Sequence, residues 1–460
     1  MSGIPLIIAF VIAIVLMILA ISKLRIHAFL SIMAIALLFA LVAGIPLTDI
    51  PDVIGTGFSN TFKSIGIVII FGALIGTLLE KTGAALKMAD VVVRAVGKKR
   101  PELAMLIMGW IVSIPVFCDS GFVILNPIRK ALAKRTGRSA VASAAALSLG
   151  LYISHCFIPP TPGPIAAANT LFETGLNQEA NLLMVIIMGA LASILPLIAS
   201  YFFAINVGKR VKSKEEMGET KEEITQSYEE LVASYGELPN AWLSFAPIVV
   251  PIILMSLSSA FNMAKLSVPV ITFLGTPIIA IAVGVIIAIY LLVSQKRSKN
   301  FYELTEETLK IAGPILFITA AGGVLGNVIA NTTMVDYIKE NAQALQAIGL
   351  LFPFLLSAIL KTAQGSSTVA LTTTAGIIAP LLPTLGLDTP VSAALTVIAI
   401  GAGAMTVSHA NDSYFWVVTN FGDLRVEDGY KTQTVGTLVA GIASIINVYI
   451  IYLFIKLFGG

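Results

Sequence analysis

Four short polar strings interrupt long apolar stretches of this sequence. They are FCDSGF at 117–122, SHCFIPPTPG at 154–163, LKTAQGSST at 360–368 and SHANDSYFW at 408–416. Their side chains carry carboxyl, amine, imidazole, amide and hydroxyl groups, which bind small polar molecules and protons. Because a polar group without a partner is costly in hydrocarbon, the strings indicate a shared polar site inside an apolar protein.

The strings contain the groups needed to hold a small hydroxylated anion. A helix that restarts after a break presents free N–H groups and a partial positive charge to an anion. Lys361 is the only cation within 347–386, and its ammonium can pair with a carboxylate. The candidate substrate-binding residues are Ser120, Gly121, Thr161, Lys361, Gln364, Gly365, Ser366, Ser367, Thr368, Asn411 and Ser413.

Ionisable side chains in the same strings are candidates for carrying a transported proton. They are Asp119, Asp412, His155 and His409. An ionisable group at membrane depth is a functional candidate, because an unpaired charge there is costly. We expect Asp119 to be the principal carrier, then Asp412, and last the histidines, which titrate near neutral pH. The structural alternatives are an ion pair of Asp119 with Lys361, a helix cap at Asp412, and ordinary buried histidines.

Composition indicates the medium around these strings. Of the 460 residues, 57% are hydrophobic and 12% are charged, about half the charged share of a soluble chain. The mean hydropathy is +0.92, and the apolar residues fall in runs of about 20, the length that crosses a hydrocarbon core. We therefore predict an all-α polytopic membrane protein. The first run, 4–22, is predicted to be a retained span, because its basic residues follow it instead of preceding it.

Charge placement predicts how the chain crosses the membrane. The stretches 103–137 and 347–386 are interrupted in the middle, and we interpret each as a re-entrant helical hairpin. Basic residues flank the first hairpin on both sides, which places its flanks in the cytoplasm, whereas the second has only Lys339 and enters from outside. When the predicted spans are followed outward from these two hairpins, with each span changing the side of the membrane, both termini lie outside. The other predicted spans are 4–22, 26–47, 65–80, 140–170, 181–206, 242–260, 267–293, 310–330, 390–420 and 433–457.

The two halves of the chain resemble each other across the charged segment 208–240. Gly76 corresponds to Gly326, Gly121 to Gly365 and His155 to His409. Since the two hairpins enter from opposite sides, the repeats are inverted, which is typical of secondary transporters whose site lies where broken helices meet. The predicted parts are N-terminal scaffold helices 1–64, repeat one 65–207, a cytoplasmic linker 208–240, scaffold helices 241–309, repeat two 310–432 and a C-terminal helix 433–460.

Long motifs around the four strings resemble the gluconate permease family of proton symporters. The motifs are FCDSGFVILNPI, SHCFIPPTPGP, AQGSSTVALTT and SHANDSYFWVV, and the resemblance covers nearly the whole chain. It implies import of gluconate or a related small hydroxy-monocarboxylate with a proton across the bacterial cytoplasmic membrane. The family resembles a larger group of carriers, which implies a homodimer with a scaffold domain and a transport domain that moves as an elevator.

The sequence leaves several alternatives open. The substrate could also be another sugar acid, glycerate or D-serine. Coupling to sodium is a further alternative, which is disfavoured because neither hairpin tip carries the Ser-Asn-Thr motif of sodium-coupled dicarboxylate relatives. An intramembrane serine hydrolase built on Ser366 and His409 is disfavoured, because the first half contains an equally polar string that a hydrolase does not need. A passive channel is disfavoured because paired inverted breaks suit alternating access. We expect no cofactor, no metal and no nucleic-acid partner; the partners are the carboxylate, protons and the bilayer.

Overall fold

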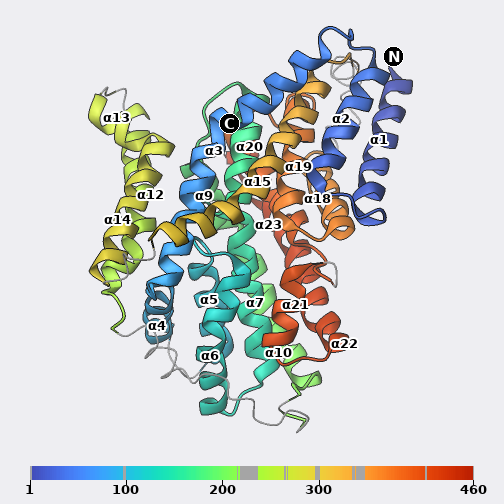
Figure 1. Cartoon of the computed structure of the whole chain (residues 1–460). Helices are drawn as coiled ribbons and strands as arrows, with labels where there is room; N and C mark the ends of the chain where they lie inside the picture. The colour runs from blue at the N-terminus through green and yellow to red at the C-terminus, as the bar shows by residue number, and fades with distance from the viewer. Residues whose placement is uncertain are drawn as a thin grey trace.

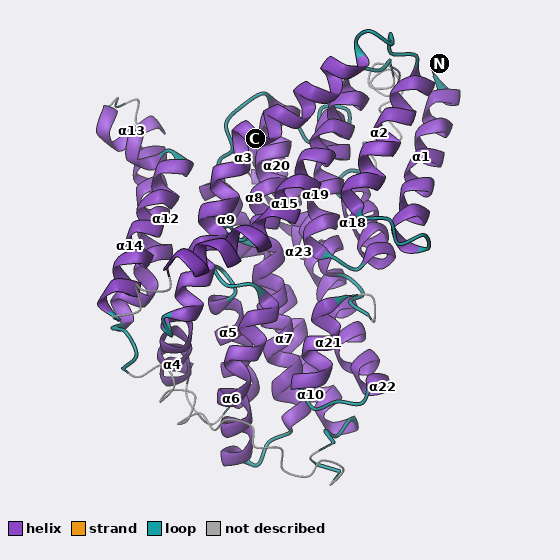
Figure 2. Ribbon diagram, in the orientation of Figure 1, coloured by secondary structure: helices purple, strands orange, loops and turns teal. Residues whose placement is uncertain are grey.

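The fold is known from a computed structural model. It describes residues 3–96, 100–214, 216–217, 237–263, 266, 268–295, 301–333, 337, 348–409 and 412–458. Every regular element in these ranges is a helix (Figure 2). The helical stretches long and apolar enough to cross a membrane are Ala140–Gly175, Leu182–Arg210, Ala241–Ser258, Pro277–Ser294, Phe301–Ala330 and Val426–Leu457. These elements confirm the prediction of an all-α polytopic membrane protein.

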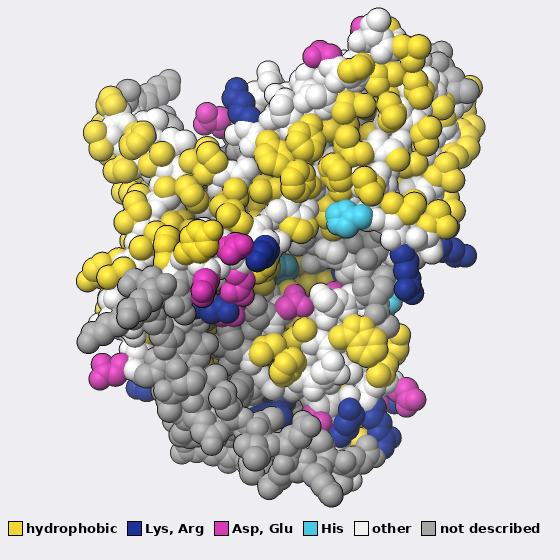
Figure 3. Space-filling model, viewed as in Figure 1, with side chains coloured by type: hydrophobic (Ala, Val, Ile, Leu, Met, Phe, Trp, Pro, Cys, Tyr) yellow, Lys and Arg dark blue, Asp and Glu magenta, His cyan; other side chains and the backbone are white. Residues whose placement is uncertain are grey.

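Two groups of apolar helices stand at opposite edges of the molecule (Figure 1). One edge holds α1 (Ile4–Ser22) and α2 (Ala28–Ala43), and the other holds α12 (Ala241–Met263), α13 (Pro269–Gly275) and α14 (Pro277–Ser294). The predicted span 267–293 is thus divided, since Pro277 has no N–H to continue the helix. Hydrophobic side chains cover both edges in Figure 3, whereas the charged ones lie mostly at mid-height and below, with a few near the top.

Two long helices connect the edges to the centre and pack against each other. They are α3 (Ile50–Lys81) and α15 (Phe301–Ala330), and each begins well before the span predicted for it. Their backbones approach closely: a Cβ on Gly57 of α3 would lie 2.8 Å from the Cα of Val324. Only glycine permits such an approach without moving one of the helices.

The first half contains the predicted hairpin and broken helix in the lower part of Figure 1. Residues 113–117 separate the hairpin arms, and residues 158–161 interrupt the broken helix, where three prolines between 159 and 162 cannot donate a hydrogen bond. The elements are α4 (Ala84–Val96), α5 (Pro101–Val112), α6 (Cys118–Thr136), α7 (Ala140–Phe157), α8 (Pro162–Thr170), η1 (Leu171–Gly175), α9 (Leu182–Ala192) and α10 (Ile194–Arg210). The predicted span 181–206 is therefore two helices, α9 and α10. Most of the predicted linker 208–240 lies outside the described residues.

The second half has the same two features, with its hairpin in the upper part of Figure 1. Gly365 and Ser366 separate the hairpin arms, and the broken helix stops at Met405 and resumes at Ser413. The elements are α18 (Leu351–Gln364), α19 (Ser367–Ile378), η3 (Ala379–Leu381), α20 (Pro390–Met405), α21 (Ser413–Phe421), α22 (Val426–Gly429), η4 (Tyr430–Thr434) and α23 (Val435–Phe458).

Each broken helix packs against the hairpin of the other half. Helix α8 contacts α19, α21 contacts α6, and the long arms α7 and α20 contact each other. At the first of these crossings, a Cβ on Gly163 would lie 2.8 Å from Leu371 Cδ1. Because each broken helix packs against the hairpin of the other half, all four polar strings lie in the middle of the molecule. The inverted relation of the halves stays a prediction.

Candidate functional site

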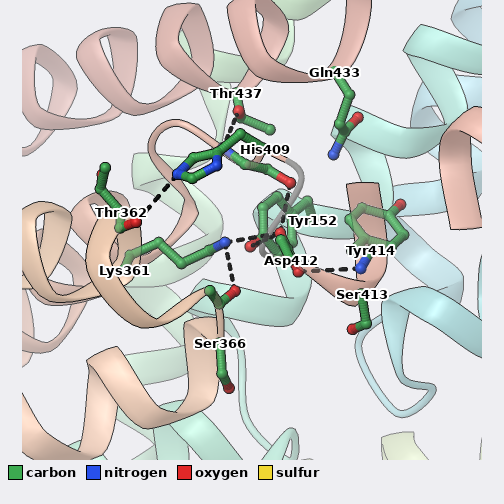
Figure 4. Close-up of polar contacts among 12 residues, drawn as sticks. Tyr152, Lys361, Thr362, Ser366, His409, Asp412, Ser413, Tyr414, Gln433 and Thr437 are labelled. Atoms are coloured by element: carbon green, nitrogen blue, oxygen red, sulfur yellow. Dashed lines mark hydrogen bonds and ion pairs between the residues drawn. The ribbon is translucent and has the colours of Figure 1, made fainter. Parts of the chain in front are cut away.

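The site lies where the second hairpin meets the second broken helix, with the first hairpin beside them (Figure 4). Its centre is an ion pair between the Lys361 ammonium and Asp412 Oδ2, 2.8 Å apart. The side chains are 0% and 5% exposed, so both charges are removed from water. A buried pair of this kind is strongly destabilised when either partner is lost.

The hairpin tip is built around Lys361. A second Lys361 N–H donates to the Gly365 carbonyl at 2.7 Å and closes the turn at the end of α18. Gly365 has a φ of +92°, a left-handed conformation that glycine adopts without strain. After this turn Ser366 begins α19 as its N-cap and accepts a hydrogen bond from the Val369 N–H at 3.3 Å. The lysine position thus depends on the same turn that starts α19.

Asp412 is both the partner of Lys361 and the cap of α21. Its Oδ1 accepts the Tyr414 N–H at 3.1 Å, which confirms the helix cap considered as an alternative. Its Oδ2 accepts the Tyr152 hydroxyl at 3.3 Å and the Ser408 hydroxyl in addition to Lys361. The carboxylate is therefore fully surrounded by donors.

Asp119 stands on the first turn of α6, beside the start of α21. Its Oδ1 accepts the Ser413 hydroxyl at 3.3 Å, and its Oδ2 accepts the Cys118 thiol at 3.6 Å. Through this bond to Ser413, Asp119 is linked to the residue that follows Asp412. The ion pair considered from sequence joined Lys361 to Asp119; the structure gives Lys361 to Asp412 instead and leaves Asp119 with the neutral donors.

The two histidines occupy different surroundings. His155 is 5% exposed, its ring centroid lies 6.0 Å from that of Phe117, and its Nδ1 has no partner among the described residues. His409 is partly buried, and its Nε2 lies 3.1 Å from the Thr362 carbonyl oxygen of the second hairpin. The carbonyl can only accept, so Nε2 carries the proton of this bond. The His409 backbone carbonyl accepts the Asp412 N–H at 2.8 Å, so His409 lies directly beside the Lys361–Asp412 pair.

Several of the other predicted binding residues form local contacts in their own part of the chain or pack against a neighbouring helix. The Thr161 hydroxyl donates to the carbonyls of His155 and Ile158 and so closes its own break. Gly121 faces α7, where a Cβ would lie 2.7 Å from Leu151 Cδ2, and Thr368 faces Gly163 of α8. Ser367 is buried in the first turn of α19. Asn411 and the side chains of Ser120 and Gln364 lie outside the described part of the chain.

A supporting layer on α23 and η4 was not predicted from the sequence. The Ser408 N–H donates to Thr437 Oγ1 at 2.9 Å, and the Thr434 hydroxyl donates to the Ser408 carbonyl at 2.6 Å. The Ser148 hydroxyl donates to Gln433 Oε1 at 2.6 Å, and the Tyr414 hydroxyl donates to the Ser148 carbonyl at 3.0 Å. The signal was present as the polar run YKTQT at 430–434, directly before the last span.

A buried arginine on α6 was also missed. Arg129 is 1% exposed and donates to Asn126 Oδ1 at 2.7 Å. It donates to the Ala140 carbonyl at 2.8 Å and to the Phe421 carbonyl at 3.3 Å, which ties hairpin one to the end of α21. Within the described residues, no group of three or more His, Cys, Asp or Glu side chains could hold a metal ion.

Comparison with other proteins identifies the family. A model of the GntP family permeases matches residues 4–454. The chain is 35% identical to a permease of Haemophilus influenzae over 456 residues, which cover 96% of this chain and 91% of that protein. It is 30% identical to the inner membrane permease YgbN of Escherichia coli over 458 residues, 96% and 97% of the two chains.

Two solved structures have the same fold. MtrF of Neisseria gonorrhoeae superposes with a TM-score of 0.66 at 15% identity, over 94% of this chain and 96% of that one. The YdaH transporter of Alcanivorax borkumensis gives 0.66 at 16% identity, over 94% and 98%. These likenesses concern the fold alone, whereas the family match extends over almost the full sequence. This chain belongs to the GntP family of permeases.

Proposed function

We propose that this permease is a symporter that imports gluconate or a related small hydroxy-monocarboxylate together with a proton. Its relatives support a small acid as substrate, since they include proteins named gluconate permease, L-idonate transporter and D-serine transporter. The observation that carries the proposal is the buried cation Lys361 paired with Asp412, with the carboxyl group of Asp119 bonded to Ser413, the residue next to Asp412. A cation can hold the substrate carboxylate, and a carboxyl group can hold the proton.

The surroundings of the cation suit a hydroxylated substrate. Ser366 and Ser367 begin α19, where backbone N–H groups and the helix dipole favour an anion. Ser413 is exposed, and its hydroxyl already bonds to the partly buried Asp119, so this pair can exchange its bond for substrate hydroxyls. We include Thr368, Gln364 and Asn411 in the proposed substrate contacts. His155 and His409 remain proposed proton carriers of lower rank.

We further propose that transport uses an elevator motion within a homodimer in the inner membrane. The hairpins and broken helices, which interlock through α8–α19 and α21–α6, would form the moving part. The flanking helices α1, α2, α12 and α14 would form the scaffold, because their outward faces are apolar (Figure 3). Both chain ends lie at the same end of the molecule in Figure 1, as two termini on the outside require.

D-serine is a second candidate substrate, because the relative named D-serine transporter matches 96% of this chain. One observation favours D-serine: the donors that Asp119 accepts from among the described residues, the Ser413 hydroxyl and the Cys118 thiol, are neutral, so its carboxylate could meet an ammonium group. A hydroxy-acid lacks that ammonium, so Asp119→Asn would weaken binding of D-serine more than binding of gluconate.

Uptake into proteoliposomes tests the proposal. Purified protein should accumulate labelled D-gluconate when the outside is more acidic than the inside, and an added protonophore should abolish the accumulation. An excess of unlabelled L-idonate, glycerate or D-serine then ranks the substrates by competition. Asp388→Asn, a change on an exposed loop residue, serves as the control and should transport as the wild type does. Accumulation of gluconate that ignores the pH gradient would contradict proton symport, and absence of uptake would contradict the substrate.

A further inference from the structure

The buried ion pair places a strict condition on substrate binding. Lys361 is 0% exposed and its ammonium already has two partners, Asp412 at 2.8 Å and the Gly365 carbonyl at 2.7 Å. A substrate carboxylate can approach this ammonium only by sharing it with Asp412 or replacing Asp412. Sharing would place two anions on one buried cation, and excess negative charge is costly in a buried site.

We propose that the substrate carboxylate replaces Asp412 as the partner of Lys361, and that the replacement occurs only when Asp412 has taken up a proton. This inference rests on the proposed function and specifies its coupling step. A proton from the outside binds the Asp412 carboxylate, the neutral carboxyl group releases Lys361, and the substrate carboxylate pairs with it. Inside, substrate and proton leave and the original ion pair forms again. No covalent bond other than the O–H bond of Asp412 changes.

The contacts of Asp412 suit both of its protonation states. The Ser408 and Tyr152 hydroxyls that bond to Oδ2 can each donate or accept a hydrogen bond. After protonation, the new O–H can therefore donate to one of them. Oδ1 keeps the Tyr414 N–H in either state, so α21 keeps its cap. The carboxyl group can lose Lys361 without leaving a buried polar atom unpaired.

The exchange conserves charge. In the empty state the ion pair holds one cation and one anion, Lys361 and Asp412. The loaded site holds Lys361, a substrate anion and a neutral Asp412, which is the same net charge. A proton without substrate, or substrate without a proton, leaves a buried charge unbalanced, and such a carrier should not cross the membrane. Coupling of one proton to one monocarboxylate, with no net charge moved, follows from the pair itself.

The geometry distinguishes Asp412 from the other titratable groups near it. These groups are Asp119 and Cys118 on α6, Tyr152, His155 and Cys156 on α7, Tyr414 on α21 and His409 in the break. Among the described residues, only Asp412 forms a salt bridge with Lys361. Asp119 accepts the Ser413 hydroxyl and does not compete with the substrate for Lys361. Asp412 therefore precedes Asp119 as the coupling carboxyl group, the reverse of the order expected from the sequence.

Binding of labelled D-gluconate to the purified full-length protein tests the inference. In the wild type, affinity should fall about tenfold for each pH unit above the range in which Asp412 holds its proton, because one proton binds with each substrate. Asp412→Asn copies the neutral carboxyl group, so its binding should not depend on pH. In proteoliposomes this variant should exchange labelled for unlabelled gluconate but should not accumulate it, since its empty site keeps an unpaired Lys361. Asp119→Asn should retain the pH slope, whatever its affinity.

Three results would overturn the inference. One is Asp412→Asn with wild-type pH dependence or wild-type accumulation, and another is Asp119→Asn with no pH slope. The third needs no variant: wild-type uptake that responds to an imposed membrane potential at constant pH would exclude charge-neutral exchange. If Asp412→Asn does not fold, the double variant Lys361→Gln with Asp412→Asn should fold, because it removes both charges of the pair together, and should not bind gluconate. Wild-type protein that binds no gluconate would instead contradict the proposed function.

Discussion

The crossing of α15 and α19 provides a sharp test of the packing around the site. Gly326 and Gly376 meet there: a Cβ on Gly326 would lie 2.4 Å from the Gly376 carbonyl oxygen. Ordinary contact begins near 3.4 Å, so Gly326→Ala must separate the two backbones by about 1 Å. Both groups are backbone, and no side chain can rotate away.

The expected loss of stability follows from two opposing contributions. Overpacking at such a position costs about 1–3 kcal/mol, because the helices must shift. Alanine recovers about 0.5–1 kcal/mol of the conformational entropy that glycine loses in a helix. The net destabilisation should therefore be about 0.5–2 kcal/mol, and the apparent melting temperature of the purified protein should fall by a few degrees.

Helix α3 offers a matched control for this measurement. A Cβ on Gly55 of α3 meets no atom within 4 Å, so Gly55→Ala should gain helix propensity and melt no lower than the wild type. Both variants should be heated at the same scan rate, since large proteins often unfold irreversibly. Equal melting temperatures for Gly326→Ala and Gly55→Ala would refute the close approach of α15 and α19.

Three further substitutions test individual contacts. Lys361→Met should destabilise the fold by about 3–5 kcal/mol, and adding Asp412→Asn should recover about 1–3 kcal/mol in a double-mutant cycle; additive losses would show that no pair exists. Thr437→Val removes the acceptor of the buried Ser408 N–H and should cost about 1–3 kcal/mol, measured by melting; an unchanged melting temperature would contradict this support of the break. Ser366→Ala removes the N-cap of α19 and should cost about 1 kcal/mol, with a higher KM for uptake; an unchanged KM would separate this cap from the substrate site.

The class of protein and the location of the candidate site could both be predicted from the sequence. Polar strings within apolar runs are a local signal, because hydrocarbon excludes them unless they face protein or water. Both hairpins and both broken helices therefore appear where expected, and family membership confirms a permease over an enzyme. The breaks themselves shift by a few residues, as at 113–117, because Cys118 and Asp119 already belong to the first turn of α6.

Features that depend on the third dimension could not be predicted. The early turns of α3 and α15 contain polar residues such as Lys63 and Glu306. A prediction from hydropathy alone therefore places the start of both helices too late in the sequence. The partner of Lys361 was ambiguous, since two aspartates lay in the strings and only the packing of α18 against the break selects Asp412. Ser148 looks like a packing residue within α7, and only the position of Gln433 reveals its hydrogen bond.

The two halves of the chain resemble each other in sequence more than in chemistry, and the difference has a physical reason. When Gly121 is matched to Gly365 and His155 to His409, Lys361 corresponds to Phe117 and Asp412 to Ile158. Ile158 is buried and apolar, and Phe117 packs beside His155. A second ion pair in the first half would place a second cation near the proposed substrate, which has only one carboxylate. That cation would have no substrate carboxylate to bind. A single pair in one half leaves Asp119 and Ser413 free to meet neutral groups, so the asymmetry of the site matches a ligand that is charged at one end.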